Sequence, residues 1–369
     1  GVAFGAEGSV PVDEQTYQRI IDKQMPWPAT YRGSSTTIDD LYHSSINGRG
    51  DFFNASNPQE LVDALKTITD RLGEREGLAP SVGSTSGRIS SDTNLYVASY
   101  DIDSWSGDLK AYSISDGSAK GDECNKKPIG KRCSSTPAWS AADQNEAHEI
   151  HMKPSNRKIF TYNSSLAAGN RGVLFRWGDS YLSATQQRQL NLLDNQGRKR
   201  LRYLRGNSRH EMPAGTFRER KAVDSGAVTR VGPITHSNPV YVGPGDSKQQ
   251  FRFPDDLEGK PYAIGSRDPL VYVGGNDGML HAYHAESLGA RPAGREAFAY
   301  VPNAVFKNLH ELTNKNFKSR AYVDGQIVLQ DAFVGNKWRT LLAGGLRKGG
   351  QGYYMLDVTS LPNTKTANK

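Results

Sequence analysis

The chain of 369 residues contains only two cysteines, and its longest unbroken apolar run is the five residues Ala297–Val301. Because a membrane-spanning helix needs about 20 apolar residues, the sequence predicts none. Catalytic signatures are absent as well: we find no Gly-x-Ser-x-Gly, His-Glu-x-x-His or Gly-x-x-x-x-Gly-Lys-Ser/Thr. We therefore expect a protein that is not an enzyme. The start at Gly1, without a basic and then apolar leader, favours a mature or excised segment.

Glycine and tyrosine are abundant. The sequence has 38 Gly and 17 Tyr, and 36% of its residues are apolar. This apolar share is too high for a disordered chain, and frequent glycine with tyrosine is typical of many short strands joined by tight turns. At about 150 residues per domain, the length predicts two domains or one large domain with an appendage.

Basic residues are concentrated in one stretch. Between Arg198 and Arg230 there are ten Lys or Arg and three acidic residues, so this window alone matches the net charge of +7 of the whole chain. Nucleic-acid binding is not favoured, because no platform of stacking aromatic residues accompanies the charges. A solvated or partner-binding segment is the preferred interpretation. The candidate residues for partner binding are Arg198, Lys199, Arg200, Arg202 and Arg205.

The two cysteines, Cys124 and Cys133, lie nine positions apart in a Lys-rich stretch. A free reactive pair, half of a zinc site and a disulfide are all compatible with this spacing. Zinc needs four ligands, and no Cys or His pair at suitable spacing lies nearby; His148 and His151 are the closest. We therefore favour a disulfide across a surface loop, which indicates an oxidising compartment.

The N-terminal part has the pattern of an α/β fold. The predicted order is a strand at 1–8, helices at 13–24 and 37–47, a strand at 49–53 and a helix from Asn57. The Gly- and Ser-rich stretch 77–93 then predicts a linker into a second domain.

The remainder is predicted to form short strands arranged in repeats. Gly107–Tyr112 and Gly278–Tyr283 share the pattern Gly-x-Leu-x-Ala-Tyr. The offset between them is about four periods of roughly 43 residues, the length of one four-stranded propeller blade. A weaker copy covers 340–360, and Asp324-Gly325 has the composition of a two-residue hairpin turn. The pattern predicts a mainly β protein with a β-propeller of four-stranded blades.

Several stretches resemble the PilC/PilY family of type IV pilus-tip proteins. The segment IDDLYHSSINGRGDFFNASNPQELVDAL is similar to the family's domain junction. Five further stretches follow in the family's order: DIDSWSGDLKAY, PAWSAADQ, RYLRG with FRERKA, ITHSNPVYVG, and the long region from VYVGGNDGMLHAYHA to LLAGGLRKGGQGYYMLDVTS. The resemblance implies that 1–76 is the C-terminal part of a von Willebrand A-like α/β domain. It makes 77–93 a linker and 94–369 most of a β-propeller, which can be incomplete at its C-terminal end.

Two metal features of the family fall outside this sequence. The Asp-x-Ser-x-Ser signature of the A domain belongs upstream of Gly1, and the family's Asp-rich calcium loop follows the Leu-Asp-Val-Thr segment in later blades. Calcium is thus expected in the family, but no cofactor is assigned to this chain. The enzyme alternative is a periplasmic quinoprotein (PQQ-type) dehydrogenase, whose blades resemble 271–287. Such enzymes carry two adjacent cysteines, which this chain lacks.

Three acidic residues are weak calcium candidates. Asp101, Asp103 and Asp108 offer several oxygen ligands, but their spacing differs from that of an EF-hand loop. His281 and His284 are three apart on a predicted strand, so they point to opposite faces and share no metal. We assign no metal site.

Arg49, Gly50 and Asp51 form the tripeptide that integrins recognise. Gly48 and Gly50 allow a tight turn with positive φ, so the loop can expose both charges. We favour a mainly structural turn in which Asp51 caps or pairs locally.

The resemblance implies a non-enzymatic, extracellular protein at the pilus tip that passes through the periplasm. It further implies minor pilins as partners, a host receptor or abiotic surface as adhesive target, and a role in pilus assembly and retraction (twitching motility). The basic window is predicted to meet acidic faces of those pilins. We expect no nucleic-acid partner.

Overall fold

The computed structural model describes two separate parts of the protein. The described residues are 2–4, 8–11, 15–16, 19, 24–47, 53–55, 82–84, 94–101, 104–118, 123–124, 126–127, 129–142, 154–220, 230–243, 264 and 267–361. The chain divides into two compact units, Gly1–Glu76 and Gly77–Lys369. Among the described residues, no helix is both long and apolar enough to cross a membrane.

The first unit pairs two short strands across one helix. β1 (Val2–Phe4) and β2 (Phe53–Ala55) are parallel neighbours, and α2 (Thr36–Asn47) lies between them in the chain. Parallel strands need a crossover connection, so this pairing is α/β in character. The opening strand and the helix at 37–47 are confirmed, whereas the second strand starts only at Phe53, where the predicted one ends. A von Willebrand A-like identity stays a prediction.

A buried carboxylate anchors α2. Asp39 accepts hydrogen bonds from the backbone N–H groups of Ser9 and Val10, both at 3.0 Å. A Cβ atom on Gly8 would collide with the same carboxylate, so glycine allows this close approach. These contacts hold the helix against the chain segment that precedes it. The helices predicted at 13–24 and from Asn57 lie almost wholly outside the described residues.

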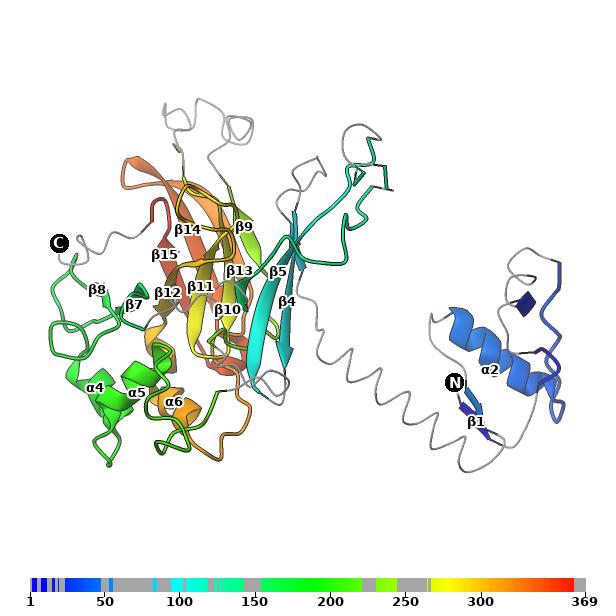
Figure 1. Ribbon diagram of the computed structural model, residues 1–369, viewed down its shortest axis with the longest axis horizontal. Coiled ribbons are helices and arrows are strands. Elements are labelled where there is room, and N and C mark those ends of the chain that lie inside the picture. The colour runs from blue at the N-terminus through cyan, green and yellow to red at the C-terminus, as the bar shows by residue number, and fades with distance from the viewer. Residues whose placement is uncertain are drawn as a thin grey trace. The chain divides into compact units, whose positions relative to one another are not determined.

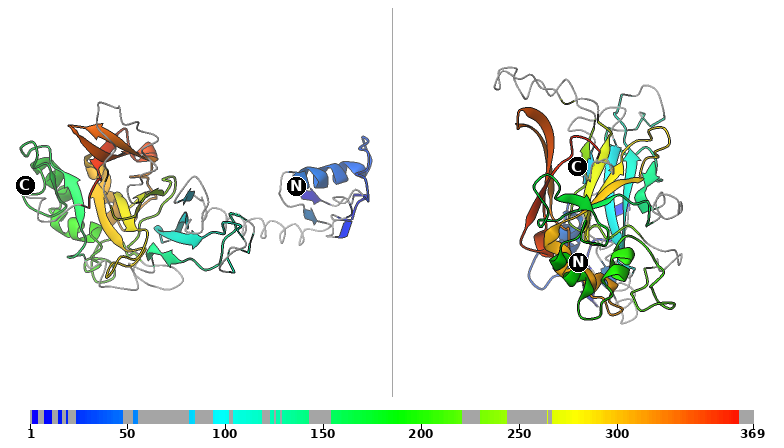
Figure 2. Two further views of the ribbon diagram at one scale, coloured as in Figure 1. Left: turned by 90° about the horizontal axis from the view of Figure 1, so that it is seen from above. Right: turned by 90° about the vertical axis from the view of Figure 1, so that its left-hand side faces the viewer.

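Within the described residues, the second unit contains three sheets, which we call sheets I, II and III. Sheet I comprises β3 (Val82–Ser84), β4 (Asn94–Asp101), β5 (Ser106–Ser113) and β6 (Trp139–Ser140). Sheet II contains β9 (Val240–Val242), β10 (Leu270–Gly275), β11 (Met279–His284) and β12 (Glu296–Val301). Sheet III comprises β13 (Ile327–Val334), β14 (Lys337–Gly345) and β15 (Tyr353–Asp357). Figures 1 and 2 show the sheets following one another in chain order, from cyan through yellow to orange-red.

The three sheets are blades of a β-propeller. β9 contacts both β3 and β13, so the first strands of the three sheets lie together. Inner strands meet in this way around the central axis of a propeller. The mainly β fold and the propeller are therefore confirmed. β3 lies inside the predicted linker 77–93, and it pairs with β4 of the first blade.

Burial distinguishes sheet II from its neighbours. Every residue of β10 and β11 is buried, whereas β5 and β14 largely alternate between buried and partly exposed positions. Val271 and Val273 pack in a core with sheet I, and Leu270 and Tyr272 pack in a core with sheet III. Sheet II is thus covered on both faces, which explains why its strands are almost continuously apolar.

The sequence repeats occupy equivalent positions. Gly107–Tyr112 lies in β5, and Gly278–Tyr283 covers most of β11; each is the third strand of its sheet. Gly278 has φ +93°, and an added Cβ would lie 2.5 Å from Leu309, so this turn requires glycine. The weaker third copy at 340–360 also forms the predicted strand, glycine turn and strand, because β14 and β15 pair across a glycine-containing turn.

The hairpin turn predicted at Asp324-Gly325 is wrong. Residues 314–326 form no strand, and β13 begins at Ile327. Asp324 is buried, and its carboxylate contacts Thr235, Asn276 at 3.1 Å and His236 at 2.8 Å. Asp324 therefore does not close a hairpin. It connects the segment before β13 of sheet III to residues next to β9 and β10 of sheet II.

A helical insertion widens sheet II. It carries β7 (Ile159–Tyr162), β8 (Gly172–Leu174), α4 (Ala184–Asn191) and α5 (Gly197–Leu204). β7 pairs in parallel with β12, which extends the blade outward. α4 contacts both α5 and the short α6 (Phe306–Leu309), and Figure 1 shows these helices gathered at one end of the sheets.

Candidate anion-binding cleft

The predicted basic patch maps onto α5 and its C-cap residue Arg205, but only part of the patch is exposed. Arg198, Lys199 and Arg202 are exposed, whereas Arg200 and Arg205 are each 6% exposed. In an amphipathic helix, a side chain at every third or fourth position points toward the protein core. The partner-binding assignment of the two buried arginines is therefore wrong.

The two buried arginines hold the insertion together. Arg200 donates to Asp194 Oδ1 at 2.6 Å and to the carbonyl of Leu190 at 2.9 Å, which ties α5 to the end of α4. Arg205 donates to the backbone carbonyls of Phe175 and Arg157, at 3.1 and 2.8 Å. Such charge-assisted bonds satisfy carbonyl groups that the loops leave unpaired.

Local sequence explains the turn between the helices. Ser183 and Gln186 form a capping box at the start of α4, each binding the other's backbone N–H. At the start of α5, Gly197 donates to Asn191 Oδ1 at 2.9 Å, and a Cβ there would lie 2.6 Å from the ring of Trp177. Glycine thus lets α5 approach Trp177 closely.

The exposed cations line a cleft of about 660 Å³ beside α5. Its lining residues are Trp177, Asn191, Asn195, Arg198, Lys199, Arg202, Arg209 and His210. Of the residues that the structure describes, four cations and no carboxylate line the cleft. Within the described part of the chain, no ion pair engages the side chains of these four cations. Burial, and then Lys199, Arg209 and Arg202, lowers the pKa of His210, which leaves that ring neutral at pH 7.

The anion-binding character follows from these charges. A concave, positively charged surface without neutralising carboxylates concentrates anionic ligands. The sequence located the charges but not the cleft, because Trp177 and Arg209 lie outside the predicted set and only the fold brings them to α5.

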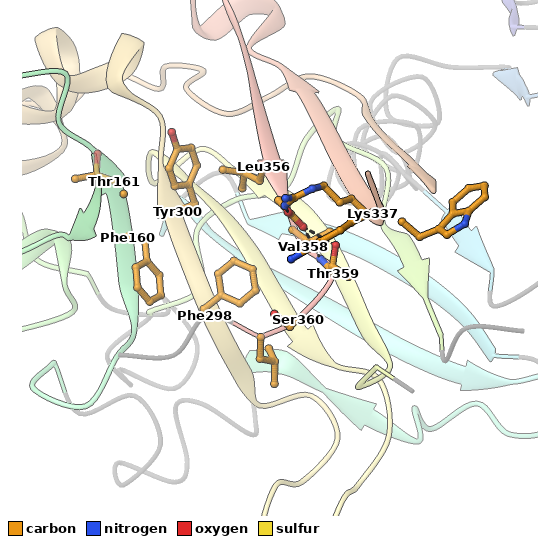
Figure 3. Close-up of a pocket in the computed structure, with 14 residues that line it drawn as sticks. Phe160, Thr161, Phe298, Tyr300, Lys337, Leu356, Val358, Thr359 and Ser360 are labelled. Atoms are coloured by element: carbon orange, nitrogen blue, oxygen red, sulfur yellow. Dashed lines mark hydrogen bonds and ion pairs between the residues drawn. The ribbon is translucent and has the colours of Figure 1, made fainter. Parts of the chain in front are cut away.

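A second, more apolar cavity of about 610 Å³ lies between sheets II and III. Figure 3 shows Phe160 of β7, Phe298 and Tyr300 of β12 and Leu356 of β15 around it. At its rim, Arg339 pairs with Asp357. Burial alone would raise the pKa of Asp357, but hydrogen bonds from Thr359 and the pairing with Arg339 lower it overall. This cavity can accommodate an apolar group. Of its polar lining residues, Thr359 donates its hydroxyl to Asp357 Oδ1 at 2.5 Å.

A buried ionic network lies in the core of sheet II. Arg157 donates to both carboxylate oxygens of Glu296 at 2.7 Å, and His281 contacts Glu296 at 2.9 Å and Asp277 at 3.1 Å. Burial alone would lower the pKa of His281, but Asp277 and Glu296 raise it to about 9. Arg157 and then His281 hold the pKa of Glu296 far below its usual range despite its burial. The four charges balance, so this network is structural.

His284 is separate from this network, and its imidazole has different neighbours from that of His281. Burial and then Arg291 lower the pKa of His284 to about 4, so its imidazole is neutral at pH 7. Sequence spacing gave the opposite directions of His281 and His284, but not their partners. The partner Glu296 comes from the next strand of the sheet.

The calcium candidates do not converge in the described residues. Asp101 accepts from the backbone N–H and hydroxyl of Ser104 at 2.7 and 2.9 Å, while Asp108 accepts from Ser140 Oγ at 2.8 Å. Asp103 lies outside the described residues. Within the described ranges, no group of three or more His, Cys, Asp or Glu is placed to hold a metal ion.

The two remaining candidates differ in what the structure describes. Cys124 and Cys133 are joined as a disulfide, with Cα atoms 4.7 Å apart. Arg49, Gly50 and Asp51 lie outside the described residues, as do His148 and His151. The tripeptide therefore stays a prediction.

Known proteins similar to this chain are type IV pilus factors. Residues 231–369 match the family described as the PilY1 beta-propeller domain. Two relatives named type IV pilus biogenesis factor PilY1, from Pseudomonas aeruginosa strains PAO1 and PAK, are each 34% identical over 371 residues, 95% of this chain and 29% of the relative. A PilY1 homolog of Xylella fastidiosa Temecula1 is 28% identical over 85% of this chain and 22% of its own length. The chain thus spans less than a third of the length of these relatives.

A solved structure is also similar in part. The crystal structure of the Pseudomonas aeruginosa PilY1 C-terminal domain is 37% identical over 33% of this chain and 23% of that chain, with a TM-score of 0.25. The blades described above, together with the sequence matches, make the second unit a PilY1-type β-propeller. Residues 231–369 belong to the PilY1 beta-propeller domain family, and 95% of the chain aligns with proteins named type IV pilus biogenesis factor PilY1.

Proposed function

We propose that the chain is part of a non-enzymatic pilus-tip protein that supports assembly and retraction of the type IV pilus. The observation that carries this proposal is the 34% identity to PilY1 biogenesis factors along 95% of the chain. A propeller also suits the role, because it is a rigid scaffold whose rim and end loops present binding surfaces.

The proposed partners are the minor pilins of the tip complex, and the proposed adhesive targets are a host receptor or an abiotic surface. The protein would pass through the periplasm and act outside the cell, at the pilus tip. The disulfide between Cys124 and Cys133 supports an oxidising compartment on that route. Twitching motility would depend on this protein through pilus retraction.

A quinoprotein dehydrogenase is the less favoured function. The relatives described above are named as pilus biogenesis factors, and the buried acidic residues of sheet II are already neutralised by Arg157 and His281. We propose no cofactor for this chain. The calcium expected of the family would bind at the Asp-rich loop, which this sequence does not contain.

Affinity capture from a piliated cell envelope tests the partner proposal. The immobilised chain is incubated with detergent-solubilised envelope from a piliated strain and from the same strain without its minor-pilin genes. We expect minor pilins to be retained from the first extract, with the matching segment of Pseudomonas aeruginosa PilY1 as positive control. Retention of minor pilins by the control segment but not by this chain would contradict the proposal.

A further inference from the structure

The cleft beside α5 has no assigned ligand. It combines four cations, Arg198, Lys199, Arg202 and Arg209, with the ring of Trp177. We propose that this cleft binds an acidic glycan, a short sugar chain that carries sulfate or carboxylate groups. The biological role of such binding, attachment to a glycan-coated surface, rests on the proposed adhesive function; the binding itself does not.

The charges argue for an anionic ligand. Arg198 and Arg202 are four residues apart on α5, about 6 Å along the helix axis, so they can contact successive anionic groups of one chain. Arg209 follows on the loop after α5, and Lys199 completes the positive lining. A ligand with several spaced negative charges is the best match to this row.

The shape and chemistry of the cleft favour a glycan over the flat face of a folded acidic protein. A volume of about 660 Å³ lies within the range of sites for small or short linear ligands, roughly 300–1,000 Å³. Trp177 supplies an apolar ring surface for a sugar ring, and the amide of Asn195 supplies donors and an acceptor for hydroxyl groups. An acidic peptide would use the charges but would not need Trp177.

The cleft is built on a fixed scaffold. Arg200 links α5 to Asp194 and to the end of α4, and Gly197 brings the helix against Trp177. These contacts fix the backbone of the helix that carries Arg198, Lys199 and Arg202. Preorganisation of this kind lowers the entropic cost of binding.

The test uses three probes on the whole chain. They are a sulfated heparin-derived hexasaccharide, the same hexasaccharide after desulfation and N-acetylation, and a glutamate-rich peptide of equal charge. Affinity is measured by calorimetry or biolayer interferometry at several NaCl concentrations. We expect the sulfated hexasaccharide to bind most tightly and to weaken as salt rises, because screening acts on exposed charges.

The decisive variant is Arg198→Gln combined with Arg202→Gln. Both side chains are exposed, so we expect an unchanged melting temperature and an affinity for the sulfated probe at least about tenfold lower. The matched control is Lys131→Gln with Lys348→Gln, which removes the same charge from exposed positions outside the cleft. Equal affinity of the double variant and the control would overturn the cleft as the site.

Trp177→Ala separates a sugar from an acidic peptide. We expect it to weaken the hexasaccharide and to leave the glutamate-rich peptide unchanged. Trp177→Phe, which keeps a ring, should retain most of the affinity and controls for loss of packing against Gly197. If the peptide binds as tightly as the hexasaccharide and both ignore Trp177→Ala, the ligand is an acidic protein segment and the glycan assignment is wrong.

The cleft and the pilus function fail in distinguishable ways. In piliated cells, the double variant should assemble normal numbers of pili but lose attachment to immobilised sulfated hexasaccharide. Failure of the wild-type chain to support pili would instead count against the proposed function.

Discussion

Glu296 is the residue whose loss should most disturb the central blade. Its side chain is 2% exposed and accepts two hydrogen bonds from Arg157, both at 2.7 Å, and one from His281 at 2.9 Å. Glu296→Gln keeps the volume of the side chain but removes its charge. Arg157 would then stay buried without the carboxylate that it now contacts in two places.

The size of the effect follows from burial. Removing one partner of a buried ion pair costs about 3–5 kcal/mol, because the remaining charge loses its compensation. A domain is stable by roughly 5–15 kcal/mol in total. We therefore expect Glu296→Gln to remove a large fraction of the free energy of unfolding of the second unit.

Urea denaturation at pH 7, followed by circular dichroism, measures this change. Glu311→Gln is the matched control, because Glu311 pairs with Arg320 on the surface. The Glu311 side chain is 34% exposed and that of Arg320 is 42% exposed. Exposed pairs contribute about 0–1 kcal/mol. If Glu296→Gln destabilises no more than Glu311→Gln, the account of a balanced, buried network is wrong.

Four further outcomes are expected. The pKa of His281 is raised to about 9 in the folded state, so its contribution to stability should be complete below pH 6.5 and be lost as the pH rises through 9. The urea denaturation midpoint should therefore fall between pH 6.5 and 9.5. A midpoint that does not fall, or that falls equally in His281→Gln, would argue against this. Reduction should release two titratable thiols, from Cys124 and Cys133, and lower stability by roughly 2–3 kcal/mol for so short a loop; two thiols already titratable in the unreduced folded protein would refute the disulfide. Asp324→Asn should lower the melting temperature, because its buried carboxylate joins the segments entering sheets II and III; an unchanged value would show that this link contributes little. Asp51→Glu should lower the melting temperature if the integrin-type tripeptide is a structural turn, whereas a loss of cell attachment alone would favour the adhesive interpretation.

Local patterns predicted the blades well. The pattern Gly-x-Leu-x-Ala-Tyr marks the third strand of sheets I and II, because its glycine permits the turn and its alternating residues suit a sheet. The glycine turn before β15 was visible for the same reason. These features depend on residues close in sequence.

Features that depend on distant residues were not predictable from the sequence. The parallel pairing of β7 with β12 joins segments about 140 residues apart. The Asp-Gly pair at 324–325 predicts a hairpin turn by its composition alone, whereas the partners of Asp324, Thr235 and Asn276, lie on other segments. A count of charges located the basic window, but it did not separate exposed Arg198 from buried Arg200. Only the packing of α5 decides that.

Replacement of the matching segment of Pseudomonas aeruginosa PilY1 by this chain tests the central claim most directly. The exchange is made in a strain that lacks its own PilY1, and surface pili and twitching zones are measured alongside secretion of the chimaera. We predict that pili and twitching are restored, and that the chimaera carrying Glu296→Gln, which disturbs the central blade, restores less. A secreted, folded chimaera that yields no pili would contradict assignment of this chain to pilus biogenesis.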